Sequence, residues 1–199
     1  GKLKMSKTKS KETSEKEVKT FANLEEDIVD SGLCCACGAC ISYCESQNFD
    51  VIEMKDYTPQ FKSKKSEENC TECGLCYYIC PQTQPIIEQI EDFYDAKGEI
   101  GHYENILAGK TTDEQIEKIG QDGGVVTTIL RYLFEKNKID GAVVSTYNEK
   151  LEPVPKLVFN KEELLDSAGT RYSISSQFLP IKDIYSIKLE VIKEKGIYD

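Results

Sequence analysis

A motif of four cysteines occurs twice in this chain of 199 residues, and this repeat constrains the fold more than any other feature. Each copy reads C-x₂-C-x₂-C-x₃-C, and Gly38 in the first copy aligns with Gly74 in the second. Gaps of two residues curl the backbone so that three thiolates converge on one centre, and a glycine lets the chain pass close to it. The cysteines are Cys34, Cys37, Cys40 and Cys44 in the first copy, and Cys70, Cys73, Cys76 and Cys80 in the second.

This spacing is typical of proteins that carry two [4Fe–4S] clusters, in which the fourth cysteine of one motif ligates the cluster of the other. Zinc sites instead use two separated pairs of ligands. A disulfide framework is disfavoured, because nine cysteines without a secretory signal point to a reducing compartment. We therefore predict a bacterial-type ferredoxin module with cluster I on Cys34, Cys37, Cys40 and Cys80, and cluster II on Cys70, Cys73, Cys76 and Cys44.

Two residues of the first motif depart from the repeat. Cys35 aligns with Thr71 and is therefore the leftover thiol. We expect it to be a small side chain packed near cluster I, with a redox role as the alternative. Glu45 stands where the first motif would often carry proline. We expect this change to loosen the crossing of Cys44 without loss of the ligand.

Charge and hydropathy limit the partners. The formal net charge is −10 and the pI about 4.8, which argues against a nucleic-acid partner. No run of 18 apolar residues is present, so no transmembrane segment is predicted. The basic stretch at 1–20 lacks an apolar region, so it is predicted to be a flexible tail rather than a secretory signal, with a nucleic-acid-binding arm as the alternative. We expect a cytoplasmic protein, or one that is membrane-peripheral through its partners.

The chain is predicted to comprise a flexible basic tail (1–20), a ferredoxin-like domain (21–98) and a second domain (99–199). In the first domain we expect a helix at 21–33, a strand at 49–54 and a loop at 55–69. In the second domain, strands are expected at 103–111, 139–146 and 154–160, and helices at 112–120, 125–138, 161–169 and 180–196. The predicted fold class is α+β, a ferredoxin module followed by an α/β domain. Because another strand should follow the last helix, that domain is expected to be truncated at its C-terminus.

Two loops of the second domain offer groups that suit a phosphate. "QDGG" (121–124) precedes an apolar helix, whose N-terminus would present free N–H groups and the positive end of the helix dipole. A plain turn is the alternative reading. In "AGTRYS" (168–173), Thr170 and Arg171 could hold a phosphate or could simply cap the loop.

Taken together, these pieces resemble a known family. The stretch "ILAGKTTDEQIEKIGQDGGVVTTILRYLFEKNKIDGAVVS" resembles the start of the coenzyme F420 hydrogenase/dehydrogenase beta-subunit family, and "SAGTRYSISSQ" resembles its next motif. Many members carry a two-cluster ferredoxin module ahead of this domain. The resemblance covers residues 22–199, ends before the family's C-terminal portion, and implies a domain that binds FAD. The cofactor-binding residues that it implies are Lys110, Thr111, Gln121, Asp122, Gly123, Gly124, Thr127, Gly169, Thr170, Arg171 and Tyr172.

The resemblance also implies an oxidoreductase: an iron–sulfur flavoprotein subunit of the beta-subunit type, acting in electron transport. Coenzyme F420 is the implied substrate. Its hydride would pass to FAD, and single electrons would continue through the clusters to redox subunits of a hydrogenase, a formate dehydrogenase or a respiratory F420 dehydrogenase. No catalytic residue is predicted, and His102 is expected at the surface. The alternatives are a related ferredoxin-dependent reductase with a sulfite, glutamate-synthase or chlorophyll-side-chain acceptor, and a flavin-free electron-transfer module.

Overall fold

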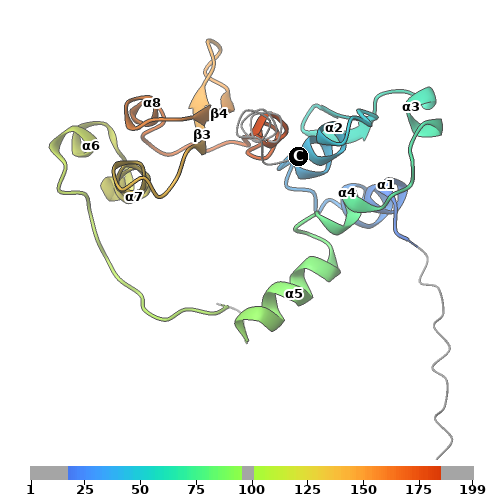
Figure 1. Ribbon diagram of the computed structural model, residues 1–199, viewed down its shortest axis with the longest axis horizontal. Helices are drawn as coiled ribbons and strands as arrows, with labels where there is room; N and C mark the ends of the chain where they lie inside the picture. The colour runs from blue at the N-terminus through green and yellow to red at the C-terminus, as the bar shows by residue number, and fades with distance from the viewer. Residues whose placement is uncertain (1–17, 96–100, 185–199) are drawn as a thin grey trace, which may run out of the picture.

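The computed structural model describes residues 18–95 and 101–184. Most of the predicted tail (1–20) and of the last predicted helix (180–196) therefore lies outside the described residues. Figure 1 shows two groups of elements, one from each half of the chain. Residues 101–113, which connect them, form neither helix nor strand.

The N-terminal group packs short helices around one β-hairpin, in which β1 pairs antiparallel with β2. Its elements are α1 (Phe21–Leu24), the π-helical turn η1 (Glu25–Val29), α2 (Ala39–Ser46), β1 (Ile52–Lys55), β2 (Thr58–Phe61), α3 (Lys64–Glu68), α4 (Leu75–Tyr78) and α5 (Gln84–Tyr94). The helix predicted at 21–33 is confirmed as α1 and η1, and the strand predicted at 49–54 is confirmed as β1. Helix α5 was not among the expected elements.

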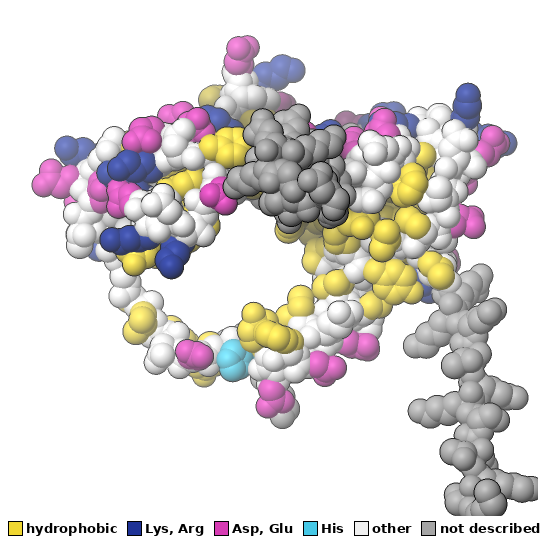
Figure 2. Space-filling view, viewed as in Figure 1, with side chains coloured by type: hydrophobic (Ala, Val, Ile, Leu, Met, Phe, Trp, Pro, Cys, Tyr) yellow, Lys and Arg dark blue, Asp and Glu magenta, His cyan; other side chains and the backbone are white. Residues whose placement is uncertain are grey.

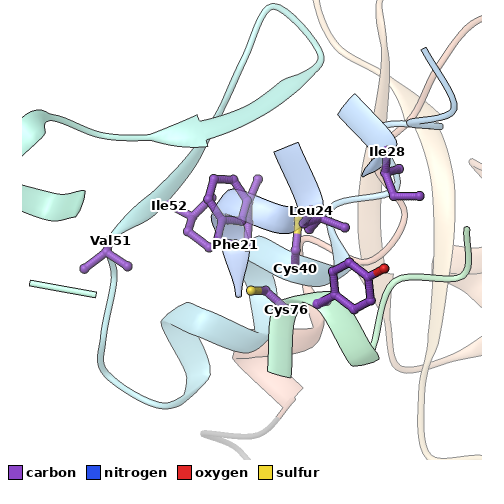
Figure 3. Packing of buried hydrophobic residues seen from close by; sticks show 9 residues of the cluster. Phe21, Leu24, Ile28, Cys40, Val51, Ile52 and Cys76 are labelled. Carbon is purple, nitrogen blue, oxygen red and sulfur yellow. The ribbon is translucent and has the colours of Figure 1, made fainter. Parts of the chain in front are cut away.

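The core of this group lies between α1, η1, α2 and β1 (Figure 3). Phe21, Leu24 and Ile52 are at most 2% exposed, and each such side chain contributes about 1.5–3 kcal/mol by leaving water. Cys40 and Cys76, one from each motif, belong to the same buried cluster. The hydrophobic core and the two cysteine motifs are therefore parts of one packed unit.

The loop predicted at 55–69 is wrong, because this stretch contains β2 and α3. Asp56 and Tyr57 both adopt positive φ, 49° and 61°, which is the geometry of a two-residue type I′ hairpin turn. Ser63 then begins α3, since its hydroxyl oxygen accepts the N–H of Ser66 at 3.1 Å. The dense charge of the stretch concealed a hairpin whose turn contains no glycine.

The C-terminal group places two helices against a second antiparallel hairpin. Its elements are α6 (Glu114–Ile119), the 3-10 turn η2 (Asp122–Gly124), α7 (Val125–Glu135), β3 (Ala142–Tyr147), β4 (Pro153–Val158) and α8 (Lys161–Leu165). The core is small: Val144, Val158 and Leu164 are buried, with Leu130 and Phe134 of α7 packed against them. The helices expected at 112–120, 125–138 and 161–169 and the strands at 139–146 and 154–160 are confirmed, although α8 ends at Leu165 rather than at 169.

Two expectations for this half are not met. The strand predicted at 103–111 is wrong: Ile106 and Leu107 are 78% and 88% exposed, and within the described ranges only β3 and β4 form a sheet here. The α/β arrangement is also not seen, because β3 and β4 are antiparallel. Residues 148–152 between them are too few for a crossover, which takes a dozen or more residues. The α+β class of the whole chain is confirmed.

Candidate functional site

The duplication of the cysteine motif is repeated in the backbone. Ala36 and Glu72, at equivalent positions, both adopt positive φ, 52° and 51°. Gly38 and Gly74 follow with φ of 85° and 75°, and each begins the helix of its copy, α2 or α4. The N–H of Ala36 points to the sulfur of Cys34 at 3.4 Å, the kind of contact that stabilises a ligating thiolate.

Each cysteine set lines a pocket of its own. One pocket is lined by all four cysteines that the sequence predicted for cluster I, together with Cys35. A second pocket is lined by all four cysteines predicted for cluster II. The fourth cysteine of each motif, Cys44 or Cys80, thus lies with the first three of the other motif, as the crossed assignment requires.

The two sets of four thiols match the ligand number of two iron–sulfur cubes. Within the described ranges, no three His, Cys, Asp or Glu side chains are close enough to share one metal ion. Binding of the clusters by these cysteines remains a prediction.

Burial raises the pKa of the more enclosed of these thiols. It raises the pKa of Cys37 to about 11 and that of Cys76 to about 12, and it raises the pKa of Cys40 as well. Uncompensated thiolates would be costly in these pockets. Bound iron would supply the positive charge that holds such thiols deprotonated.

Cys35 lies at the edge of the cluster I pocket. It lines that pocket but is exposed. Thr71, its counterpart, lines the cluster II pocket in the same way and is also exposed. Cys35 is therefore next to the cluster I pocket, as expected, but its side chain is exposed rather than packed, whereas the neighbouring Ala36 is buried.

The three segments predicted to bind FAD meet in space. The N–H of Thr111 donates to the carbonyl oxygen of Gly123 at 2.7 Å. Thr170 joins the third segment: its N–H donates to Oε1 of Gln121 and its hydroxyl donates to Oδ2 of Asp122, both at 2.7 Å. These residues come from stretches up to about 60 positions apart, so their convergence is a property of the fold.

The glycine pair shapes the turn before α7. Gly123 and Gly124 have φ of 80° and 65°. A Cβ on Gly123 would lie 2.9 Å from the carbonyl oxygen of Gly109, and one on Gly124 would lie 2.8 Å from Cγ2 of Ile116. No side chain caps the N-terminus of α7, so this turn leaves N–H groups free for an anion.

Thr128 is a site residue that the sequence analysis missed. Its hydroxyl lies 2.9 Å from the carbonyl oxygen of Gly124 and 2.7 Å from Oγ1 of the buried Thr111. The Thr128 hydroxyl therefore holds Thr111 close to the turn before α7. Thr127, which was predicted instead, is buried at the start of α7. The spacing of four residues from Gly124 to Thr128 is the available signal, since threonine hydroxyls often bond the carbonyl four residues earlier in a helix.

Arg171 is held within its own loop. Its Nη1 donates to the carbonyl oxygens of Ala168 and Gly169, and the guanidinium lies over the Tyr147 ring at 4.3 Å. Its Nε is buried and has no hydrogen-bond partner among the described residues. A buried N–H of this kind is unfavourable unless it donates to an acceptor. An anionic group bound at this loop would provide that acceptor.

The remaining predicted residues are peripheral. Lys110 pairs with Glu117 at 3.0 Å, and Tyr172 is 84% exposed. His102 is exposed as expected (Figure 2), and its ring stacks on that of Tyr94. None of the helices in the described ranges is long and apolar enough to cross a membrane.

Comparison with known proteins places the chain in a family. Residues 106–182 match the model of the N-terminal region of coenzyme F420 hydrogenase/dehydrogenase beta subunits. The coenzyme F420-dependent sulfite reductase of Methanocaldococcus jannaschii is 35% identical over 150 residues, which cover 75% of this chain and 21% of the reductase. A subunit of the F420H2 dehydrogenase of Methanosarcina mazei is 30% identical over 152 residues, 74% of this chain and 40% of that protein.

A shorter match has a higher sequence identity. The beta subunit of the coenzyme F420 hydrogenase of Methanosarcina barkeri is 38% identical over 95 residues, 47% of this chain and 31% of that subunit. The matches thus span less than half the length of each of these three relatives. The two longer ones each cover about three quarters of this chain. The chain belongs to the coenzyme F420 hydrogenase/dehydrogenase beta-subunit family.

Proposed function

We propose that this chain is an iron–sulfur flavoprotein part of an F420-linked oxidoreductase. In this role it exchanges electrons between coenzyme F420 and the redox subunits of a larger complex, such as a hydrogenase, a formate dehydrogenase or a respiratory F420 dehydrogenase. The observation that carries the proposal is the pairing of the two cysteine pockets with the three converging loops in one chain. The named relatives, a hydrogenase subunit, a dehydrogenase subunit and a sulfite reductase, support it.

Different residues serve the two kinds of cofactor. The eight cysteines hold two [4Fe–4S] clusters, and the core shields the side of each that Cys40 or Cys76 contacts. FAD lies at the loops, where the N-terminus of α7 and the Nε of Arg171 face its anionic groups. When bound, FAD supplies the exchange between a hydride and single electrons. The protein sets the distance and orientation between the cofactors and the electric field around them. We place it in the cytoplasm.

Two alternatives rest on particular observations. The match to the sulfite reductase over 75% of this chain favours a related reductase with another acceptor. A flavin-free electron-transfer module is favoured by the glycine pair, because close packing against Gly109 and Ile116 accounts for Gly123 and Gly124 without a flavin.

Visible absorption of the anaerobically purified chain separates these functions. The proposal predicts one flavin per chain and about eight irons, the iron content of two [4Fe–4S] clusters. Reduced coenzyme F420, and not NADH, should bleach both chromophores. A chain that contains iron but no flavin would favour the flavin-free electron-transfer module. Flavin and iron that another donor or acceptor turns over, but coenzyme F420 does not, would favour the related reductase.

A further inference from the structure

The two cysteine motifs are equivalent by duplication, but different segments of the chain pack against their glycines. A Cβ on Gly38, beside cluster I, would lie 2.7 Å from Cγ of Leu179. A Cβ on Gly74, the equivalent glycine beside cluster II, would lie 2.5 Å from Cγ1 of Val18 and 2.6 Å from the carbonyl oxygen of Lys19. Segments from opposite ends of the described chain thus pack against the two motifs.

Residues 176–183, which we call the strap, hold the cluster I side by named contacts. The N–H of Phe178 donates to the carbonyl oxygen of Cys37 at 2.9 Å. Further along, the N–H of Lys182 donates to the hydroxyl oxygen of Ser42 at 2.8 Å, and Ser42 is only 2% exposed. The ammonium of Lys182 also pairs with the carboxylate of Glu45 at 2.5 Å. These bonds fix the strap to both ends of α2.

The pairing with Lys182 accounts for Glu45, the residue that replaces the expected proline. A proline at this position would provide no carboxylate for the strap. Glu45 is 19% exposed at its side chain, so its charge is partly removed from water, and the lysine compensates it. The departure from the motif and the presence of the strap are thus physically linked.

The strap follows directly on the third loop of the FAD-type site. Only seven residues separate Thr170, bonded to Gln121 and Asp122, from Phe178, bonded to Cys37. A fully extended chain of eight steps spans at most about 28 Å. Figure 1 shows this C-terminal segment reaching the N-terminal group beside α2. The strap therefore limits how far the loop and the cluster I pocket can separate.

We propose that the strap is a positioning element that ties cluster I to the flavin loop, so that cluster I is the first cluster to receive electrons and cluster II the second. This inference rests on the proposed function for the presence of flavin and clusters. With FAD bound at the loops, the transfer would release two electrons and two protons from its reduced form. Each cluster gains one electron, and the protons leave to solvent. Leu179 and Phe178 act through Gly38 and Cys37 rather than by touching a reacting atom.

The test compares two matched truncations in the full chain loaded with iron and sulfide. Leu179→Ala uncovers the glycine of the cluster I motif, and Val18→Ala uncovers its equivalent in the cluster II motif. Because solvent exposure sets the potential of such clusters, a redox titration followed by electron paramagnetic resonance should show a different cluster shifted to more positive potential in each variant. Cys80→Ser, which removes a cluster I ligand, should abolish the signal that Leu179→Ala shifts.

A second arm measures electron flow. With FAD bound and reduced coenzyme F420 as donor, Leu179→Ala should slow cluster reduction at least fivefold, while Val18→Ala leaves the first reduction step unchanged. The inference is overturned if both variants shift the same cluster, or if Leu179→Ala shifts neither. If the chain binds clusters but no flavin, the proposed function fails, and the titration still decides which cluster the strap contacts. A chain that takes up no iron overturns both.

Discussion

Replacing Gly124 tests whether the turn before α7 is a rigid part of the second half. Gly124 has φ of 65°, and an added Cβ would lie 2.8 Å from Cγ2 of Ile116, a side chain with no exposed surface. The left-handed backbone costs an alanine about 1–2 kcal/mol, and overpacking costs about 1–3 kcal/mol. Gly124→Ala should therefore destabilise this half by about 2–5 kcal/mol, a large part of the roughly 5–15 kcal/mol typical of a domain.

The assay is urea unfolding followed by circular dichroism, with iron content measured on the same samples. A loss of about 2 kcal/mol lowers the midpoint by about 1–2 M at the slopes usual for small domains. Gly109→Ala is the matched control, because nothing lies within 4 Å of its added Cβ. Gly124→Asp would add a buried carboxylate and should also abolish flavin binding while the iron content stays intact. Equal effects of Gly109→Ala and Gly124→Ala, or loss of iron together with flavin, would refute this account.

Three further predictions concern single side chains. Cys35→Ser should keep all the iron, whereas Cys34→Ser should lose cluster I, as measured by iron and sulfide analysis; the reverse result would move the ligand assignment by one residue. Thr170→Val removes the hydroxyl that bonds Asp122 and should weaken FAD binding about fivefold, the equivalent of about 1 kcal/mol; Thr170→Ser should retain affinity in a fluorescence titration, and equal affinity in both variants would remove the bond from the site. Tyr57→Gly relieves a positive φ of 61° and should stabilise the β1–β2 hairpin by about 1 kcal/mol; a lower urea midpoint would show that the tyrosine ring contributes more than its backbone strain costs.

Most of the features that could be predicted from the sequence depend on short stretches of residues. The cysteine spacing predicted two groups of four, and the pockets contain the same groups, because short gaps fix the local curl of the chain. Helix α6 begins within the predicted range 112–120, since the carboxylate of Asp113 accepts two backbone N–H groups. The curl of each motif and the start of α6 are decided within about ten residues, whereas the crossing of Cys44 and Cys80 joins the two motifs.

Contacts between distant residues were harder to predict. The strand predicted at 103–111 needs a neighbouring strand, and the structure gives this stretch none within the described ranges. The apolar helix predicted at 125–138 is only partly covered: Leu130 packs on the core while Val126 is 73% exposed. The bond from Phe178 to Cys37 joins residues 141 positions apart and has no signature in either local sequence.

The most direct test of the central claim is the metal content of the anaerobically purified chain, measured with the two crossing cysteines replaced in turn. The wild-type chain should contain about eight irons and eight sulfides, the composition of two cubes. Cys44→Ser and Cys80→Ser should each remove a different cluster, cluster II in the first variant and cluster I in the second, as identified by electron paramagnetic resonance. Zinc in place of iron, about four irons in the wild-type chain, or loss of the same cluster from both variants would contradict the crossed two-cluster assignment.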